Sequence, residues 1–159
     1  YWKEAGKMIS RIAGGDPLQW GPMLIKDNKI FGPGGTMLHY ETLGFYKPQA
    51  DEEVQEFERD GYWRYRTRHG WTKLYSGKLV ENVVQWLARI VMMQSMLRIR
   101  ARGYRVVMRT HDELVWLVPR DGHEQAHLSY LSAEMKQTPA WLPSLPLDAE
   151  AHLGERYEK

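Results

Sequence analysis

Three adjacent titratable side chains, His111-Asp112-Glu113, form the group in this sequence that is best suited to chemistry. They lie between two apolar segments, residues 104–110 and 114–118, whose composition predicts β-strands. Neighbouring carboxylates repel each other unless water or a cation neutralises them. Carboxylate oxygens favour Mg²⁺ or Mn²⁺ over zinc, and one or two carboxylates with substrate phosphates form a typical Mg²⁺ site. The triplet therefore predicts a hairpin tip that binds a divalent metal or a polar ligand, although a solvated turn has the same composition.

A long helix is predicted just before this hairpin. Residues 78–102 contain no Gly or Pro, and Gly103 ends the stretch. Apolar residues occur on most sides of this helix, which predicts a position in or across the core. Asn82, Gln85 and Arg89 follow one another at i, i+3 and i+7, so they form one polar stripe. That stripe either binds a polar ligand or simply faces water.

Basic and aromatic side chains alternate in residues 62–68, and a turn at His69-Gly70 leads into residues 71–75. The alternation predicts a β-hairpin with one positive face. Such a face suits a nucleic-acid backbone, although solvated strands carry the same residues. The candidate phosphate contacts are Lys78 at the start of the long helix and, on the hairpin, Arg64, Arg66 and Arg68.

The charge distribution also indicates a polyanionic partner for the middle of the chain. The formal net charge is only +2, but residues 61–120 carry 12 basic and 3 acidic side chains. Residues 1–60 carry 7 basic and 10 acidic side chains, and residues 121–159 carry 3 and 7. A basic band of this kind is the footprint of a surface that meets a polyanion. Residues 51–60 hold six carboxylates and predict an exposed acidic loop or short helix.

Length and composition exclude several classes of protein. With 159 residues, of which 43% are hydrophobic, the chain can bury one core of ordinary size and is not disordered. No apolar run is long enough to span a bilayer, and the first residues do not resemble a secretory signal. The absence of Cys excludes disulfides and thiolate zinc sites, and it fits a reducing compartment such as the cytoplasm.

The remaining segments predict further helices and strands. A helix is expected over residues 1–13, ended by Gly14-Gly15, and Asp121 is expected to cap a helix that ends at Met135. Short strands are expected at residues 23–25, 37–40 and 147–153. The sum predicts an α+β fold, with an antiparallel sheet that carries the His-Asp-Glu hairpin and is backed by long helices.

In this order, the segments resemble the C-terminal palm of family A DNA polymerases, and the phage members in particular. His111-Asp112-Glu113 resembles motif C of the family, and Gln85, in the stretch Lys78-Leu79-Val80-Glu81-Asn82-Val83-Val84-Gln85, resembles the Gln of the preceding helix. The turn at residues 32–35 is similar to the family's turn ahead of that helix, although Thr36 stands where the family usually has Arg. Residues 145–150 and Arg156-Tyr157 resemble the closing strand of the phage members.

The resemblance implies a magnesium-dependent nucleotidyltransferase of DNA replication. Asp112 would be one of two aspartates that bind two Mg²⁺ ions, and these ions stabilise the attacking oxygen and the leaving pyrophosphate. Glu113, as a second metal-site residue, would tune the metals or orient the site. His111 would lie along the primer backbone, and Gln85 would reach the minor groove, where every base pair offers acceptors. The implied partners are primer–template DNA and deoxynucleoside triphosphates.

The family's second aspartate, in motif A, and its fingers helix have no counterpart in residues 1–159. The chain is therefore expected to be a single partial domain, inactive alone, whose second Asp comes from an upstream part of the polymerase. If a phage encodes it, the expected location is the cytoplasm of a bacterial host. One alternative is a non-catalytic DNA-binding or assembly fragment. Another is the palm of a single-subunit RNA polymerase, but those enzymes resemble His-Asp-Ser where this chain has Glu113.

Overall fold

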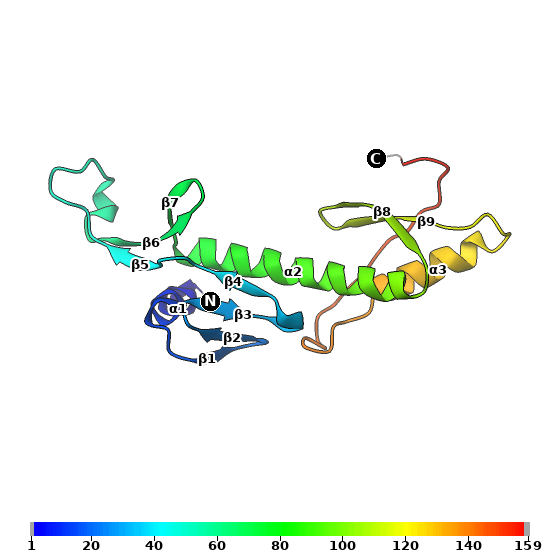
Figure 1. Cartoon of the computed structure of the whole chain (residues 1–159), viewed down its shortest axis with the longest axis horizontal. Coiled ribbons are helices and arrows are strands. Elements are labelled where there is room, and N and C mark those ends of the chain that lie inside the picture. Colours follow the sequence, from blue (N-terminus) through cyan, green and yellow to red (C-terminus); the bar gives the residue numbers. More distant parts are fainter. Residues whose placement is uncertain (1, 158–159) are drawn as a thin grey trace. The chain divides into compact units, whose positions relative to one another are not determined.

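The computed structural model describes residues 2–157 and divides the chain into two compact units, Tyr1–Leu87 and Ala88–Lys159. Figure 1 shows helices together with antiparallel strands, so the predicted α+β class is confirmed. The strands form three separate sheets of four, three and two strands within the described residues, a division that the sequence did not indicate. No helix in this part of the chain is long and apolar enough to cross a membrane.

The first unit contains one helix and two antiparallel sheets. A four-stranded sheet has the order β1-β2-β3-β4, and a three-stranded sheet has the order β5-β6-β7. The elements are α1 (Trp2–Gly14), β1 (Leu18–Trp20), β2 (Met23–Lys26), β3 (Lys29–Phe31), β4 (Met37–His39), β5 (Gly44–Tyr46), β6 (Tyr62–Thr67), β7 (Gly70–Lys73) and the first half of α2 (Ser76–Ala101). Two 3₁₀ turns, Pro33–Gly35 and Glu56–Glu58, lie in the connections.

Turn chemistry explains where several of these elements end. α1 ends at Gly14, and Gly15 has φ +75°, the left-handed conformation that commonly follows a helix. Asp27 and Asn28 both have positive φ and form the two-residue turn between β2 and β3. Asn and Asp tolerate this conformation better than other non-glycine residues, and such turns match the twist of paired strands.

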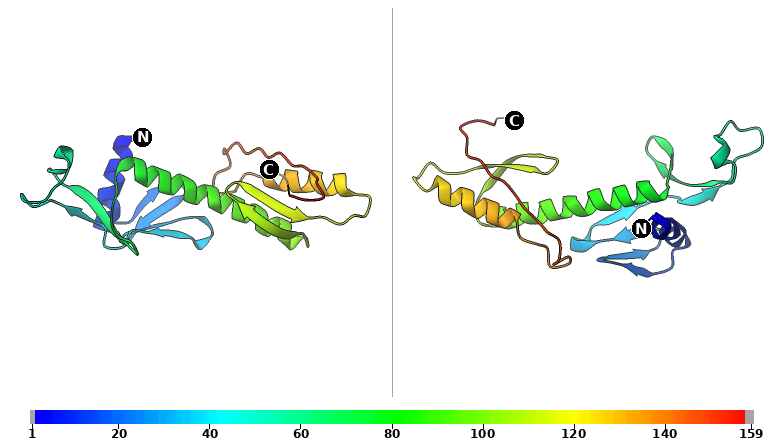
Figure 2. Two further views of the ribbon diagram at one scale, coloured as in Figure 1. Left: turned by 90° about the horizontal axis from the view of Figure 1, so that it is seen from above. Right: turned by 180° about the vertical axis from the view of Figure 1, so that it is seen from behind.

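A hydrophobic core joins these elements within the first unit. Two isoleucines of α1, Ile9 and Ile12, pack with the buried side of the four-stranded sheet and with Leu79 and Val83 of α2. Partly buried aromatic side chains of β6 cover the same core. Figure 2 shows α1 and the sheet together in both views. The core therefore fixes the start of α2, which carries Lys78 and Gln85.

The second unit contains the end of α2, the hairpin of β8 (Arg105–Thr110) and β9 (Glu113–Leu117), and α3 (Glu124–Met135). Arg98 of α2 reaches α3, where its guanidinium donates to the Glu134 carboxylate at 3.0 Å and to the Glu134 carbonyl at 2.8 Å. The C-terminal segment then passes alongside α3, with the Ser132 hydroxyl donating to the Ala149 carbonyl and Lys136 paired with Asp148.

Two of the predicted elements are wrong in detail. Residues 147–153 form no strand; the Ala149 carbonyl instead accepts from the Ser132 hydroxyl of α3, and Asp148 pairs with Lys136, which directly follows α3. Asp121 does not cap α3, which begins at Glu124; its carboxylate accepts from the His123 amide in the preceding turn. The short strands β1, β3 and β5 were not predicted, since each has only three residues.

Candidate functional site

The turn between β8 and β9 brings the three titratable residues together. Thr110 pairs with Glu113, so His111 and Asp112 form a two-residue loop and Glu113 begins β9. His111 has φ +46°, a left-handed conformation that glycine adopts most readily. A non-glycine residue held there costs on the order of 1 kcal/mol or more, and such positions cluster at functional sites.

The two carboxylates of this turn differ in their surroundings. All three side chains are exposed. Within residues 2–157, the Asp112 carboxylate has no hydrogen bond and no ion pair. The Tyr157 hydroxyl donates to Glu113 Oε2 at 2.9 Å, and this bond is the main reason that the pKa of Tyr157 is raised. Asp112 is therefore free to bind a ligand from solvent, whereas the C-terminal segment orients Glu113.

Asp112 and Glu113 could supply some of the ligands of a Mg²⁺ ion. Carboxylate oxygens are the ligands that Mg²⁺ prefers, and Asp112 presents two of them at an exposed turn. In the described part of the chain, no group of three or more His, Asp or Glu side chains is arranged to hold a metal ion. A site that includes Asp112 and Glu113 would thus need further ligands, for example substrate phosphates, from outside the described residues.

The two predicted site residues of α2, Lys78 and Gln85, lie in the first unit. Lys78 is paired with Glu81 at 3.1 Å, and Gln85 donates to the other Glu81 oxygen at 3.4 Å, so the half-buried Lys78 and the exposed Glu81 and Gln85 form one row. The hydrogen bond to Glu81 raises the pKa of Lys78. Asn82 is different, because its amide donates to the Tyr40 hydroxyl at 3.2 Å. Exposed pairs such as Lys78–Glu81 contribute little stability, so a phosphate could replace Glu81 as the partner.

The three arginines of the predicted hairpin also lie in the first unit, and they have different environments. Arg64 and Arg66 lie on β6, where their guanidinium carbons are 4.4 and 5.6 Å from the Trp71 ring centroid. Arg68 lies in the turn and donates to the His69 ring at 3.0 Å. The candidate residues therefore form separate groups, with the carboxylates in the second unit and the arginines, Lys78 and Gln85 in the first.

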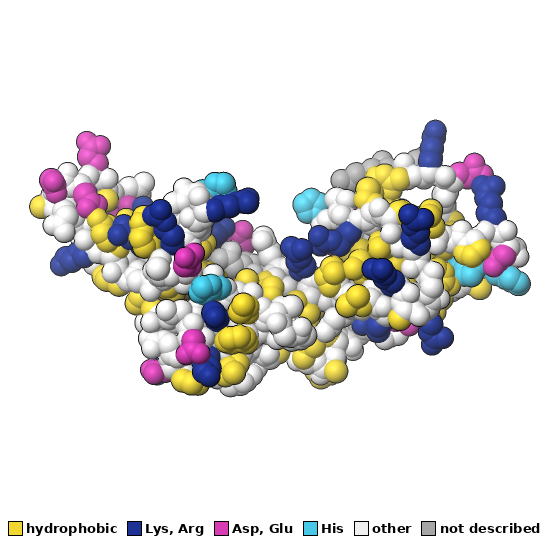
Figure 3. Space-filling view, viewed as in Figure 1, with side chains coloured by type: hydrophobic (Ala, Val, Ile, Leu, Met, Phe, Trp, Pro, Cys, Tyr) yellow, Lys and Arg dark blue, Asp and Glu magenta, His cyan; other side chains and the backbone are white. Residues whose placement is uncertain are grey.

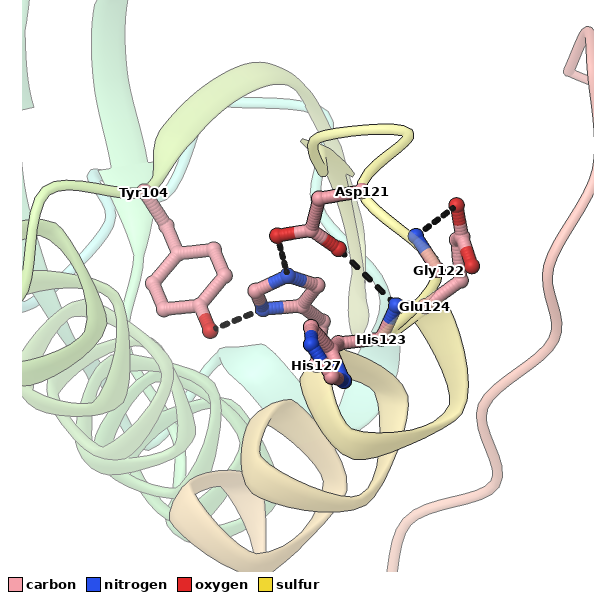
Figure 4. Close-up of polar contacts among 6 residues, drawn as sticks. All are labelled: Tyr104, Asp121, Gly122, His123, Glu124 and His127. Atoms are coloured by element: carbon pink, nitrogen blue, oxygen red, sulfur yellow. Dashed lines mark hydrogen bonds and ion pairs between the residues drawn. The ribbon is translucent and has the colours of Figure 1, made fainter.

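A further polar network in the second unit was not predicted (Figure 4). The Tyr104 hydroxyl lies 2.7 Å from His127 Nδ1, and His127 Nε2 lies 3.2 Å from Asp121. The amide of His123 donates to the same carboxylate, and these bonds hold the pKa of Asp121 below its usual value. The network contains no nucleophile such as Ser or Cys; it ties the start of α3 to the start of β8. The spacing of Asp121 and His127, six residues apart, gave no local signal for it.

Comparison with known proteins relates part of the chain to one polymerase. A stretch of 91 residues, 56% of this chain, is 40% identical to the DNA polymerase of Bacillus phage SP02. The match spans only 14% of the length of that protein. No family model matches the chain, and no solved structure matches it. The chain therefore contains a region related to a phage DNA polymerase.

Proposed function

We propose that the chain is the C-terminal palm region of a family A DNA polymerase, and that it contributes Asp112 to the site of nucleotidyl transfer. One observation carries this proposal: an exposed Asp with no described partner occupies a two-residue hairpin turn in a chain related to a phage polymerase. Other exposed carboxylates, such as that of Asp51, also lack a described partner, so what distinguishes Asp112 is its position beside Glu113 at the hairpin turn and the relation of the chain to a polymerase. Asp112 has an environment suited to an external cation.

Asp112 would hold Mg²⁺ together with a second Asp from outside this chain. When bound, two Mg²⁺ ions stabilise the negative charge that develops on the attacking and leaving oxygens. Glu113, oriented by Tyr157, would adjust the position and charge of the site without binding the substrate itself. His111, held in a left-handed turn, would place its ring against the backbone of the primer.

The residues of the first unit would position the DNA. Gln85 is exposed and can exchange its bond with Glu81 for an acceptor in the minor groove. Lys78 and Arg68 would contact phosphates of the duplex, and Arg64 and Arg66 would contact phosphates of the unpaired part of the template. Such contacts fix the position of the DNA without reading its sequence. The substrates in this proposal are primer–template DNA and deoxynucleoside triphosphates, and the partner is the upstream part of the polymerase.

The substitution Asp112→Asn tests the proposal. It preserves the size of the side chain and removes one negative charge. In a polymerase reconstituted from this chain and an upstream polymerase fragment, we expect primer extension to fall by at least about 100-fold, since the lost charge acts on the transition state. Binding of primer–template DNA should change less than about twofold, because the lost charge acts on the transition state and not on the bound DNA before the reaction.

Asp51→Asn is the matched control, because it removes the same charge from an exposed Asp in the acidic segment. It should leave extension unchanged. Near-normal extension by the Asp112→Asn enzyme would refute the metal assignment. If extension by the unmodified chain is absent with every upstream fragment while DNA binding is retained, the alternative of a non-catalytic DNA-binding fragment is favoured instead.

A further inference from the structure

The outer side of the β5-β6-β7 sheet carries a set of aromatic and basic side chains that share one surface. Cross-strand partners project to the same side of a sheet. The register pairs Tyr46 with Tyr62, Arg64 with Lys73, and Arg66 with Trp71. Residues 62, 64 and 66 alternate along β6 and so project to this same side. We call this surface the aromatic-basic face; its members are Tyr46, Tyr62, Arg64, Arg66, Trp71 and Lys73.

The opposite side of the sheet is fixed to the core. Trp63 and Tyr65 of β6 pack against the hydrophobic cluster of the first unit. The Tyr65 ring meets the buried Tyr40 ring edge to face, with centroids 5.1 Å apart. The sheet therefore has one side that the fold requires, and the aromatic-basic face is turned away from it.

Aromatic rings hold the arginines of this face in place. The Arg64 guanidinium carbon lies 3.4 Å from the Tyr46 ring centroid and 4.4 Å from the Trp71 ring centroid. Arg66 approaches the same Trp71 ring at 5.6 Å. Stacking on a ring leaves the N–H groups at the edge of the guanidinium available, and it reduces the entropy lost when they bind an anion. Both arginines are therefore oriented to donate to an incoming phosphate.

Carboxylates of the adjacent acidic segment bond to other members of the face. Glu52 accepts from the Tyr46 hydroxyl, and the buried Glu58 accepts from Lys73. Neither Arg64 nor Arg66 has a carboxylate partner among residues 2–157. Figure 3 shows basic and hydrophobic side chains close together over this sheet, with acidic side chains on the loop beyond it. The two central cations of the face remain available for an external anion.

We infer that the aromatic-basic face binds single-stranded DNA, with phosphates on Arg64 and Arg66 and a base stacked on Trp71. The choice of DNA rests on the proposed function. Alternate residues of a strand lie about 6.8 Å apart, so the two guanidiniums can reach neighbouring phosphates of one backbone. The Trp71 side chain is 49% exposed and can accept an unpaired base. Bases in a duplex are already stacked on each other, so the face should prefer a single strand.

Fluorescence anisotropy with a labelled oligo-thymidine tests the inference on the full chain at several salt concentrations. The double variant Arg64→Gln with Arg66→Gln removes both positive charges. The slope of log affinity against log salt concentration should then fall by about 1.4, or about 0.7 per phosphate contact. At 0.1 M salt that change corresponds to binding that is about 25-fold weaker. Trp71→Leu should weaken binding by at least about fivefold and leave the salt slope unchanged.

Two further variants separate binding from folding and from net charge. Lys7→Gln with Arg11→Gln removes two exposed positive charges from α1 of the same unit, and it should change the salt slope little. Arg64→Lys with Arg66→Lys keeps the charge and should restore most of the slope. Circular dichroism verifies that each variant is folded.

Failure of this inference can be distinguished from failure of the proposed function. The binding assay involves no nucleotide addition, so it reports on the aromatic-basic face independently of nucleotidyl transfer. If the arginine and Trp71 variants bind as the unmodified chain does, the inference is overturned whatever the extension assay shows. Tighter binding to a duplex than to oligo-thymidine would also overturn it. Loss of binding in these variants supports the face as a DNA site even where Asp112→Asn leaves extension intact.

Discussion

The hydrogen bond between Asn82 and Tyr40 gives a sharp test of the structure around α2. The Asn82 amide donates to the Tyr40 hydroxyl at 3.2 Å, and Tyr40 is only 3% exposed. Burial is the main cause that raises the pKa of Tyr40 to about 12. Asn82→Ala therefore leaves a buried hydroxyl without its donor, which costs about 1–3 kcal/mol of stability.

Gln85→Ala is the matched comparison, because it removes a similar amide one turn later on the same helix. Gln85 is exposed and bonds only to the exposed Glu81, so its loss should change the free energy of unfolding by less than about 0.5 kcal/mol. The assay is urea denaturation followed by tryptophan fluorescence. A loss of 2 kcal/mol with a slope of about 2 kcal/mol per molar urea shifts the midpoint by about 1 M.

A double-mutant cycle isolates the bond itself. Tyr40→Phe removes the hydroxyl and leaves the half-buried Asn82 amide able to reach water, at a cost of about 0.5–1.5 kcal/mol. Combined with Asn82→Ala, it should cost less than the sum of the single changes, with a coupling of about 1 kcal/mol. Equal effects of Asn82→Ala and Gln85→Ala, or strict additivity in the cycle, would refute this description of the helix face.

Three other predictions follow from the second unit. His111→Gly should leave stability unchanged or raise it by about 1 kcal/mol, because glycine adopts φ +46° without strain, while primer extension falls; urea denaturation and extension assays measure both. The Asp121 pKa is lowered in the folded state, so Asp121 stabilises the fold above pH 3.8, and this contribution disappears as the pH falls further. The Asp121→Asn variant should therefore lose less stability in that acid range than the unmodified chain, as measured by circular dichroism. Arg98→Met should cost about 1–3 kcal/mol in urea denaturation, because Ser95 and Glu134 lose their donor, whereas the exposed Arg100→Met should cost under about 0.5 kcal/mol.

The sequence predicted the features that depend on neighbouring residues. Helical periodicity and the glycines after it placed α1 and α2 to within a few residues. Alternation and turn residues placed the hairpins β6-β7 and β8-β9, with His111-Asp112 in the turn. These features are local, because backbone conformation and turn chemistry are decided by residues a few positions apart. The candidate carboxylates of the site could therefore be named from the sequence.

Only the tertiary structure decided which polar groups bond to each other. Asn82 lies on the same predicted stripe as Gln85, yet it bonds to Tyr40, which is 42 residues away in the chain. Tyr157 reaches Glu113 from 44 residues away, and Arg64 is held between rings from β5 and β7. Partners so distant in sequence leave no periodic signal. Their contacts depend on how the strands and helices pack. That packing is determined by the burial of apolar residues from the whole fold.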